Sequence, residues 1–550
     1  MTTTKSIDAG GDEAPIGAPT VPTVDERSAL GLRTVVYVCG LAVVVIAAFI
    51  VRAIPLTNGL PYPSYIDEHF VLRPAALVYA DRTWDPGFYI YPPFLIYATA
   101  VVALILRLLP GGSDVGIGAT LDQPIRSNIL SPDLILGGRL TVLVLSTATV
   151  LVVGLLARRL MGRRAGIVAA VLVASTPALV SRSAIVIVDV PAAFFATACL
   201  LCATYLQGSR RTMAWAVGGG AFAGLAAASK YTAGAAVLAL VTVIALERGP
   251  TIVQKARLGV AALAGAGVTL IVAAPTVVLR AGAVLDETRD NLRDTYRMKA
   301  GTSYWQELLN DNEVGWVLLA ATGMGAVVLV ASRRTRPVTL GFGLYAIVLV
   351  GPLAAFPFQP FRNLVPLLPF LAVAAAAAVV RAVDGLGRLV PVKGATSVAL
   401  AVMCALAIGA IMTDASWPFY RRTRIDLVDS RIEARRWFQA NADNDDLVLV
   451  AAEIGFAPSE LERIPGRVVV RSLEKPENAS VTAGFDYVVG GDFPSTEPWR
   501  PALYDRRIWV SFGNRKTLVH PRSFRFPRQA VRVFGAPGTR DTSECFPLCG

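Results

Sequence analysis

The sequence predicts a polytopic α-helical membrane protein that carries a small α/β domain at its C-terminus. Its 550 residues have a mean hydropathy of +0.54 and are only 17% charged, whereas soluble globular proteins are about 25% charged. The apolar residues gather in long uncharged runs such as 35–50 and 395–412. Runs of this kind cross the roughly 30 Å hydrocarbon core as helices, and these lack the alternating pattern of barrel strands.

The formal net charge of +12 raises nucleic-acid binding as an explanation for a basic chain. The arginines and lysines, however, cluster in short segments between apolar runs, where they act as topology signals. We therefore expect no nucleic-acid partner and expect membrane lipids around the chain.

Basic segments between the apolar runs define the topology. Four short ones stand out, at 158–164, 210–211, 255–257 and 333–336. If all four are cytoplasmic, an even number of crossings must separate each neighbouring pair, and two apolar runs lie between each pair. A further basic loop at 381–393 precedes the last span, 395–413. The N-terminus is then cytoplasmic and the chain after the last span is extracytoplasmic.

The apolar stretch 94–109 would break this parity if it crossed the membrane. The first span, 34–54, runs outward, and the run 134–157 must run inward to reach the first basic segment. We therefore expect 94–109 to be a juxtamembrane or re-entrant helix on the outer side, with a twelfth crossing as the alternative. The prediction is about eleven transmembrane helices plus juxtamembrane helices.

The domain prediction has three parts. Residues 1–33 are rich in Gly, Pro, Thr and acids, which predicts a disordered cytoplasmic tail. Residues 34–413 form the transmembrane domain, with a long outer loop at 55–133. Residues 414–550 form an extracytoplasmic α/β domain, because 429–440 has helical spacing and three short apolar runs (447–451, 468–470 and 487–489) are typical of strands.

The six cysteines divide into two groups. Four lie inside apolar runs, where they pack as small hydrophobic residues, and the spacing of Cys199 and Cys202 has no nearby ligand to make it a metal site. Cys545 and Cys549 lie in the polar tail and could pair if that tail is exported.

The first outer loop contains adjacent carboxylates, Asp67 and Glu68, which suit general-base chemistry at a membrane surface. By themselves they could be surface acids in a solvated turn. Asp189 lies in a second outer junction, within an apolar stretch, where a carboxylate needs a partner or a polar cavity. Arg182 is a candidate partner, and an Arg182–Asp189 pair could simply fix a helix end.

Two cations lie on the outer face, against the positive-inside tendency. Lys230 stands between two apolar runs, and Arg362 precedes another. Either could snorkel to the interface, or could contact a lipid-linked phosphate. His69 is the only histidine of the membrane part, so a histidine-based metal site is not expected, although carboxylates alone could hold a divalent cation. No phosphate-binding Gly-Lys-Ser/Thr loop or Gly-x-Ser-x-Gly elbow is present.

The set of motifs on this face resembles the GT-C glycosyltransferases, and most closely the branch of protein O-mannosyltransferases and lipid A aminoarabinose transferases. The matching residues are Asp67-Glu68, Pro92-Pro93, Arg158-Arg159-Leu160-Met161-Gly162-Arg163-Arg164, Arg182 with Asp189, Gly224-Leu225 with Ser229-Lys230, and Arg362-Asn363-Leu364 with Pro366. The resemblance covers residues 34–381. Each motif is short, and their order and common face give the set its specificity.

The resemblance implies inverting transfer of a sugar from a polyprenyl-phosphate donor to a hydroxyl of an envelope glycan, lipid or protein, at the outer side of the cell membrane. The implied roles are general base for Asp67, positioning of acceptor or base for Glu68 and Asp189, donor-phosphate binding for Lys230, Arg362 and Arg182, and substrate binding for Tyr65, His69, Tyr91 and Tyr231.

Two positions depart from the pattern of these relatives. Tyr91 stands where many carry Lys before the Pro-Pro, and Asn363 replaces their Tyr. Both leave the donor's identity open. Two other functions remain as alternatives: a secondary transporter or lipid flippase that uses Asp189 and Lys230 in a central pathway, and a non-catalytic membrane scaffold whose exported domain binds a partner.

Overall fold

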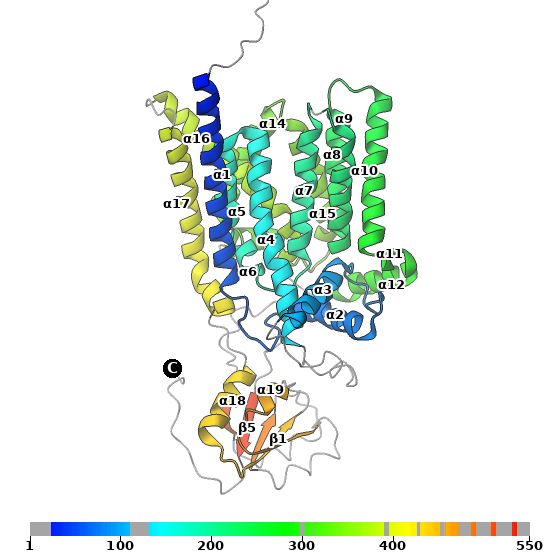
Figure 1. Ribbon diagram of the computed structural model, residues 1–550, viewed down its shortest axis with the longest axis vertical. Helices are drawn as coiled ribbons and strands as arrows, with labels where there is room; N and C mark the ends of the chain where they lie inside the picture. The colour runs from blue at the N-terminus through cyan, green and yellow to red at the C-terminus, as the bar shows by residue number, and fades with distance from the viewer. Residues whose placement is uncertain are drawn as a thin grey trace, which may run out of the picture.

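The computed structural model describes residues 24–109, 131–208, 210–297, 303–310, 312–389, 395–425, 430–451, 456, 458–471, 486–490, 508–512 and 531–535. Figure 1 shows long helices standing side by side in a bundle, with a small sheet domain beyond one end. We call the end nearer that domain, where α7 (Asp189–Leu206) begins, the site end. The opposite end, where α4 (Pro132–Met161) finishes, is the basic end.

Helices occupy all eleven segments that the sequence predicts as spans. Besides α4 and α7 they are α1 (Val24–Ala53), α5 (Arg163–Ala174), α8 (Thr212–Ser229), α9 (Ala236–Leu246), α10 (Ile252–Ala273), α14 (Trp316–Ala331), α15 (Arg336–Ala354), α16 (Leu368–Leu389) and α17 (Ala395–Tyr420). Within the described residues, seven helical stretches are long and apolar enough to cross a membrane, and three apolar helices are shorter. The polytopic helical membrane fold is confirmed, while the count of eleven crossings stays a prediction.

The basic segments meet at one end, as the parity argument requires. Arg159 Nη2 donates to the Gln207 carbonyl (3.0 Å), and Arg334 Nη2 donates to the Arg159 carbonyl (3.0 Å). Arg163 Nη2 donates to Thr34 Oγ1 (2.8 Å), which brings the start of the first span to the same place. Consecutive helices joined by short loops must run antiparallel, so the acids and cations of the outer loops gather at the site end.

Small residues allow the helices to pack closely, which is how membrane helices associate without a hydrophobic driving force. A Cβ placed on Gly220 of α8 would lie 2.0 Å from the carbonyl oxygen of Ala262 in α10. On Gly325 of α14 it would lie 1.6 Å from the carbonyl oxygen of Ala374 in α16. Substitution at either position would force these helix pairs apart.

Short elements cover the site end (Figure 1). They include η1 (Ile66–Glu68), α2 (His69–Asp81), α3 (Phe94–Leu108), α6 (Pro177–Arg182), η3 (Tyr231–Ala235), α11 (Thr276–Leu279), α12 (Ala281–Asn291), η4 (Leu292–Tyr296), α13 (Tyr304–Leu309) and η5 (Phe361–Leu367). Helix α3 packs on the first turns of α4 beside α2 at the site end, and its assignment as a juxtamembrane or re-entrant helix on the outer side stays a prediction. Its Leu108 and Val101 side chains remain exposed, which is expected of a juxtamembrane helix.

The C-terminal domain begins after a π-helical turn, η6 (Arg421–Ile425), that follows α17. It contains α18 (Ser430–Asn441), α19 (Pro458–Leu461), β1 (Leu447–Ala451), β2 (Arg467–Arg471), β3 (Tyr487–Gly490), β4 (Ile508–Phe512) and β5 (Val531–Gly535). The sheet order is β2-β1-β3-β5-β4; β1 pairs parallel with β2 and β3, and β5 pairs antiparallel with β3 and β4. The predicted helix and three strands are confirmed, whereas β4 and β5 were not predicted.

Two observations concern the predicted boundaries. Helix α1 begins at Val24, inside the tail predicted at 1–33, and residues 1–23 lie outside the described part of the chain. Helix α17 continues to Tyr420, seven residues beyond the predicted end of the last span.

Cys199 and Cys202 are buried and free, as small hydrophobic residues should be. The predicted Cys545–Cys549 pairing lies outside the described residues.

Candidate active site

The site is built around two ion pairs at the site end. In the first pair, Arg362 Nη1 in η5 donates to Asp67 Oδ2 in η1, across 295 residues of sequence. Both side chains are largely buried, at 20% and 13% exposure. The short helix η1 turns the Asp67 carboxylate towards the start of α16, and burial makes this pairing stronger than an exposed one.

The second pair is Lys230 with Asp189. Lys230 Nζ donates to Asp189 Oδ1 (2.6 Å) and to Asn363 Oδ1 (2.9 Å). The Asn363 amide in turn donates to the hydroxyls of Tyr304 (3.0 Å) and Tyr296 (3.3 Å). Because Asn363 follows Arg362 in η5, the two ion pairs are neighbours. Lys230 is 13% exposed and bound on two sides, so the snorkelling interpretation is wrong.

Two predicted tyrosines border these pairs. Burial raises the pKa of Tyr91, whose phenol also feels the charges of Arg362, Asp67 and Asp189. Burial and the nearby Asp67 carboxylate raise the pKa of Tyr65. Both phenols are therefore neutral near pH 7 and can donate a hydrogen bond.

Tyr231 contacts the first outer loop, and its role in substrate binding stays a prediction. Its hydroxyl donates to the Tyr89 carbonyl (3.0 Å), and the Tyr89 amide donates to Glu287 Oε2 (2.7 Å) in α12. Tyr231 thus ties the first outer loop to η3.

Arg182 does not pair with Asp189, so that predicted pair is corrected. The Arg182 guanidinium binds Glu313 with two parallel hydrogen bonds, Nη2 to Oε1 at 2.8 Å and Nη1 to Oε2. The reason is position: Glu313 lies just before α14 and reaches the last turn of α6, while Lys230 takes Asp189. Glu313 was not predicted as a site residue, although its position directly before an apolar run could have indicated it.

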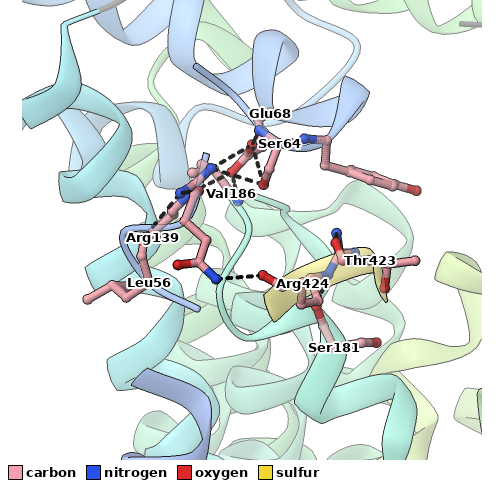
Figure 2. A network of polar contacts seen from close by, with 10 residues as sticks. Leu56, Ser64, Glu68, Arg139, Ser181, Val186, Thr423 and Arg424 are labelled. Carbon is pink, nitrogen blue, oxygen red and sulfur yellow. Dashed lines mark hydrogen bonds and ion pairs between the residues drawn. The ribbon is translucent and has the colours of Figure 1, made fainter. Parts of the chain in front are cut away.

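Glu68 is a buried structural group, not a residue that can contact substrate (Figure 2). It is 0% exposed. Its Oε1 accepts from Arg139 Nε (3.1 Å) and the Val186 amide (3.0 Å), and its Oε2 accepts from the amides of Ser64 (2.6 Å) and Tyr65 (3.1 Å). Burial alone would raise the pKa of this carboxyl, but Arg139 and the backbone donors hold it below its ordinary value. The role implied for Glu68, positioning of the acceptor or the base, stays a prediction, and its contacts with the loop that carries Asp67 favour positioning of the base.

Arg139 was the residue missed in that network. It is fully buried in α4, and its Nη1 also donates to the carbonyls of Leu56 (3.1 Å) and Asn58 (2.8 Å). Arg139 and Glu68 therefore fasten both arms of the segment 56–68 to the bundle and fix where Asp67 stands. An arginine within the apolar run 134–157 was the signal that could have identified it.

His69 follows Glu68 and begins α2. Its electrostatic neighbours are Arg73, Glu68 and Arg431, and its Nδ1 is buried without a hydrogen-bond partner. Burial, together with Arg73, lowers the pKa of His69 to about 4. The prediction that His69 binds substrate has no support from a contact with Asp67, Arg362 or Lys230.

The buried His69 is expected to make the protein acid-sensitive. Its ordinary pKa is 6.5 and its folded pKa is about 4, so the unfolded chain binds a proton in a window where the native state does not. Stability should be complete above pH 6.5 and fall by about 3 kcal/mol as the pH drops towards 4. Thermal unfolding in detergent across this range should show a shallower slope for His69→Gln. Equal slopes for the two proteins would contradict the prediction.

The arrangement offers two paired carboxylates, Asp67 and Asp189, as candidates for proton abstraction, and several cations for a phosphate. Among the residues that the structure describes, no group of three or more His, Cys, Asp or Glu side chains could hold a metal ion. The charges of the site suit general-base attack combined with electrostatic stabilisation of an anionic leaving group.

Known proteins resemble the chain in part of its sequence and in its fold. Residues 128–279 match the family of dolichyl-phosphate-mannose-protein mannosyltransferases. That segment contains Arg139, Arg182, Asp189 and Lys230, and excludes Asp67. No curated protein matches the chain in sequence.

Two solved structures of ArnT from Cupriavidus metallidurans share the fold. The structure bound to undecaprenyl phosphate has a TM-score of 0.54 and 15% identity, and the match covers 90% of this chain and 98% of ArnT. The structure in the apo state has a TM-score of 0.55 and 13% identity, and the match covers 93% and 100%.

Proposed function

We propose that this chain, which belongs by its fold to the GT-C glycosyltransferases of the protein O-mannosyltransferase and aminoarabinose transferase branch, moves a sugar from a polyprenyl-phosphate donor to an acceptor hydroxyl. The reaction takes place at the site end, on the extracytoplasmic side of the membrane. The acceptor is an envelope glycan, lipid or protein. ArnT was solved with undecaprenyl phosphate bound, which supports a lipid phosphate as the donor class.

One observation carries the proposal: the Asp67–Arg362 and Asp189–Lys230 pairs meet through the neighbouring residues Arg362 and Asn363. A transporter pathway would place such groups in mid-membrane, whereas these lie at helix ends beside the juxtamembrane elements. A carboxylate beside two cations is what transfer from a phosphate to a hydroxyl needs.

The proposed reaction is a single displacement. Asp67 takes the proton of the acceptor hydroxyl, and the acceptor oxygen forms a bond to the anomeric carbon while the bond from that carbon to the phosphate oxygen breaks. The electron pair stays on the leaving polyprenyl phosphate, whose charge Lys230 and Arg362 neutralise. Attack opposite to the leaving group inverts the anomeric carbon.

The other residues take supporting roles in this scheme. Asp189 and Asn363 hold Lys230 Nζ from two sides. Arg182, whose charge Glu313 balances, keeps its guanidinium near Tyr65. The neutral phenols of Tyr65 and Tyr91 can donate to sugar or phosphate oxygens. A divalent cation is not required by the scheme, because the cations needed for the phosphate are supplied by side chains.

The function is tested by incubating the purified chain with a panel of polyprenyl-monophosphate sugars and measuring release of free polyprenyl phosphate. Release from at least one donor, dependent on an added acceptor, is expected. Transport of an intact lipid-linked sugar across a proteoliposome membrane without release would instead favour a flippase.

Lys230→Met should weaken use of the donor more than it alters the acceptor. Removal of one charge-assisted hydrogen bond to the phosphate is expected to lower kcat/KM for the donor by about 10- to 100-fold. Lys255→Met is the matched control, because Lys255 bonds the Ala245 carbonyl at the basic end. Equal kinetics for both variants would remove Lys230 from the phosphate site.

A further inference from the structure

Arg424 reaches the site from the turn that joins the last helix to the C-terminal domain. Its Nε donates to the Ser181 carbonyl (2.8 Å), and its guanidinium lies 5.6 Å from the centre of the Tyr65 ring. The backbone around it is fixed as well, because the Asn58 side-chain amide donates to the carbonyls of Arg424 (2.8 Å) and Ile425 (3.0 Å). Figure 2 shows Arg424 beside Ser181, close to the network of Glu68 and Arg139.

The guanidinium of Arg424 has no carboxylate partner among the residues that the structure describes. Its hydrogen bonds go to two backbone carbonyls, of Ser181 and of Thr423 (3.3 Å). The Arg424 side chain is half-buried, and desolvation lowers its pKa; the nearby Glu68 carboxylate acts in the opposite direction, but its own hydrogen bonds go to Arg139 and to the loop backbone. A cation that is partly removed from water and has no carboxylate bound to it is costly, so a group that supplies the negative charge is expected when the site is occupied.

The charges around Tyr65 do not balance. Three guanidinium groups, of Arg182, Arg362 and Arg424, act on its phenol. Two of them are neutralised, Arg182 by Glu313 and Arg362 by Asp67. The Tyr65 phenol is neutral, so the positive charge of Arg424 remains in excess beside the proposed base.

We propose that Arg424 is a binding residue of the active site that holds a phosphate-type oxyanion next to Tyr65. A guanidinium suits this ligand, because its planar donors form parallel hydrogen bonds to phosphate oxygens. The oxyanion belongs either to the lipid donor or to an anionic acceptor. The inference deepens the proposed function and rests on it for the chemical class of the ligand.

In this role, the turn η6 between α17 and the C-terminal domain forms part of the active site. Arg424 and the loop that carries Asp67 are joined through Asn58, so an oxyanion held by Arg424 would lie at a fixed position relative to the base. The extracytoplasmic domain follows directly, and its attachment therefore supplies a residue of the site.

Binding to the full-length chain in detergent micelles tests the inference without requiring transfer. Arg424→Gln is titrated with undecaprenyl phosphate, and with inorganic phosphate after saturation with undecaprenyl phosphate. A Kd for the lipid raised about tenfold or more places the donor phosphate on Arg424. Unchanged lipid binding with loss of inorganic phosphate binding places a second, acceptor-borne oxyanion there. Wild-type affinities in both titrations overturn the inference, as does failure of the wild-type protein to bind either probe.

Two further variants provide a second test and a matched control. Arg424→Lys retains the charge but not the planar guanidinium, so it should raise the Kd of the affected probe by about three- to tenfold. If Arg424→Gln does not fold, unchanged affinities in Arg424→Lys would contradict the inference in its place. Arg421→Gln, an exposed arginine of the same turn, should bind both probes as the wild type does. A chain that binds through Arg424 and releases no sugar from any donor would refute the proposed function and leave the oxyanion site standing.

Discussion

Asp67→Asn is expected to reduce sugar transfer by about 10²- to 10⁴-fold, which is the usual contribution of a general base. The amide keeps the shape of the side chain but cannot take the proton of the acceptor hydroxyl. The substitution also removes the charge that faces Arg362, so binding of polyprenyl phosphate should be retained or strengthened. The measurement is the rate of polyprenyl-phosphate release with a donor that the wild type uses, together with the Kd for undecaprenyl phosphate.

Asp384→Asn is the matched control for Asp67. Asp384 pairs with Arg164 at the basic end, at 2.9 Å, and both side chains are over a third exposed. Its substitution should leave transfer unchanged. Undiminished transfer in Asp67→Asn would take the role of base from Asp67, and Asp189 would then be the carboxylate to test.

Glu68→Ala should destabilise the protein by about 3–5 kcal/mol, the usual result of removing one partner of a buried ion pair. Arg139 would remain in the apolar interior without its counter-charge, and the amides of Ser64 and Val186 would lose their acceptor. The loss should appear as a lower Tm in detergent. Transfer should fall as well, because the turn that presents Asp67 would no longer be fixed.

The double variant Glu68→Leu with Arg139→Met separates charge from packing. It leaves no unpaired buried charge, so it should be more stable than Glu68→Ala, although the carbonyls of Leu56 and Asn58 lose their donor. Arg164→Met, which breaks an exposed pair, should cost no more than about 1 kcal/mol. A Glu68→Ala protein as stable as Arg164→Met would show that the buried network does not hold the loop.

Much of the fold could be predicted because its signals are local. Each apolar run specifies a helix, and each basic segment specifies an end of the bundle, so parity alone placed 94–109 among the juxtamembrane elements. The same reasoning placed Asp67, Asp189, Lys230 and Arg362 on a common face. Strands β4 and β5 were not predicted, although Ile508–Phe512 and Val531–Gly535 are short apolar runs of the same kind as the predicted strands.

The sequence by itself determined that the chain is a helical membrane protein and which types of charge meet at the site end, since these depend on composition and on the order of short segments. The number of crossings and the orientation of the termini stay predictions. Only the tertiary structure decided how those charges are partnered. The adjacent residues Asp67 and Glu68 have different partners, because η1 turns Asp67 towards Arg362 and Glu68 into the bundle towards Arg139. Arg182 and Asp189 likewise found distant partners in Glu313 and Lys230. Such pairings depend on the distances between helices packed far apart in sequence, and spacing along the chain carries no record of them.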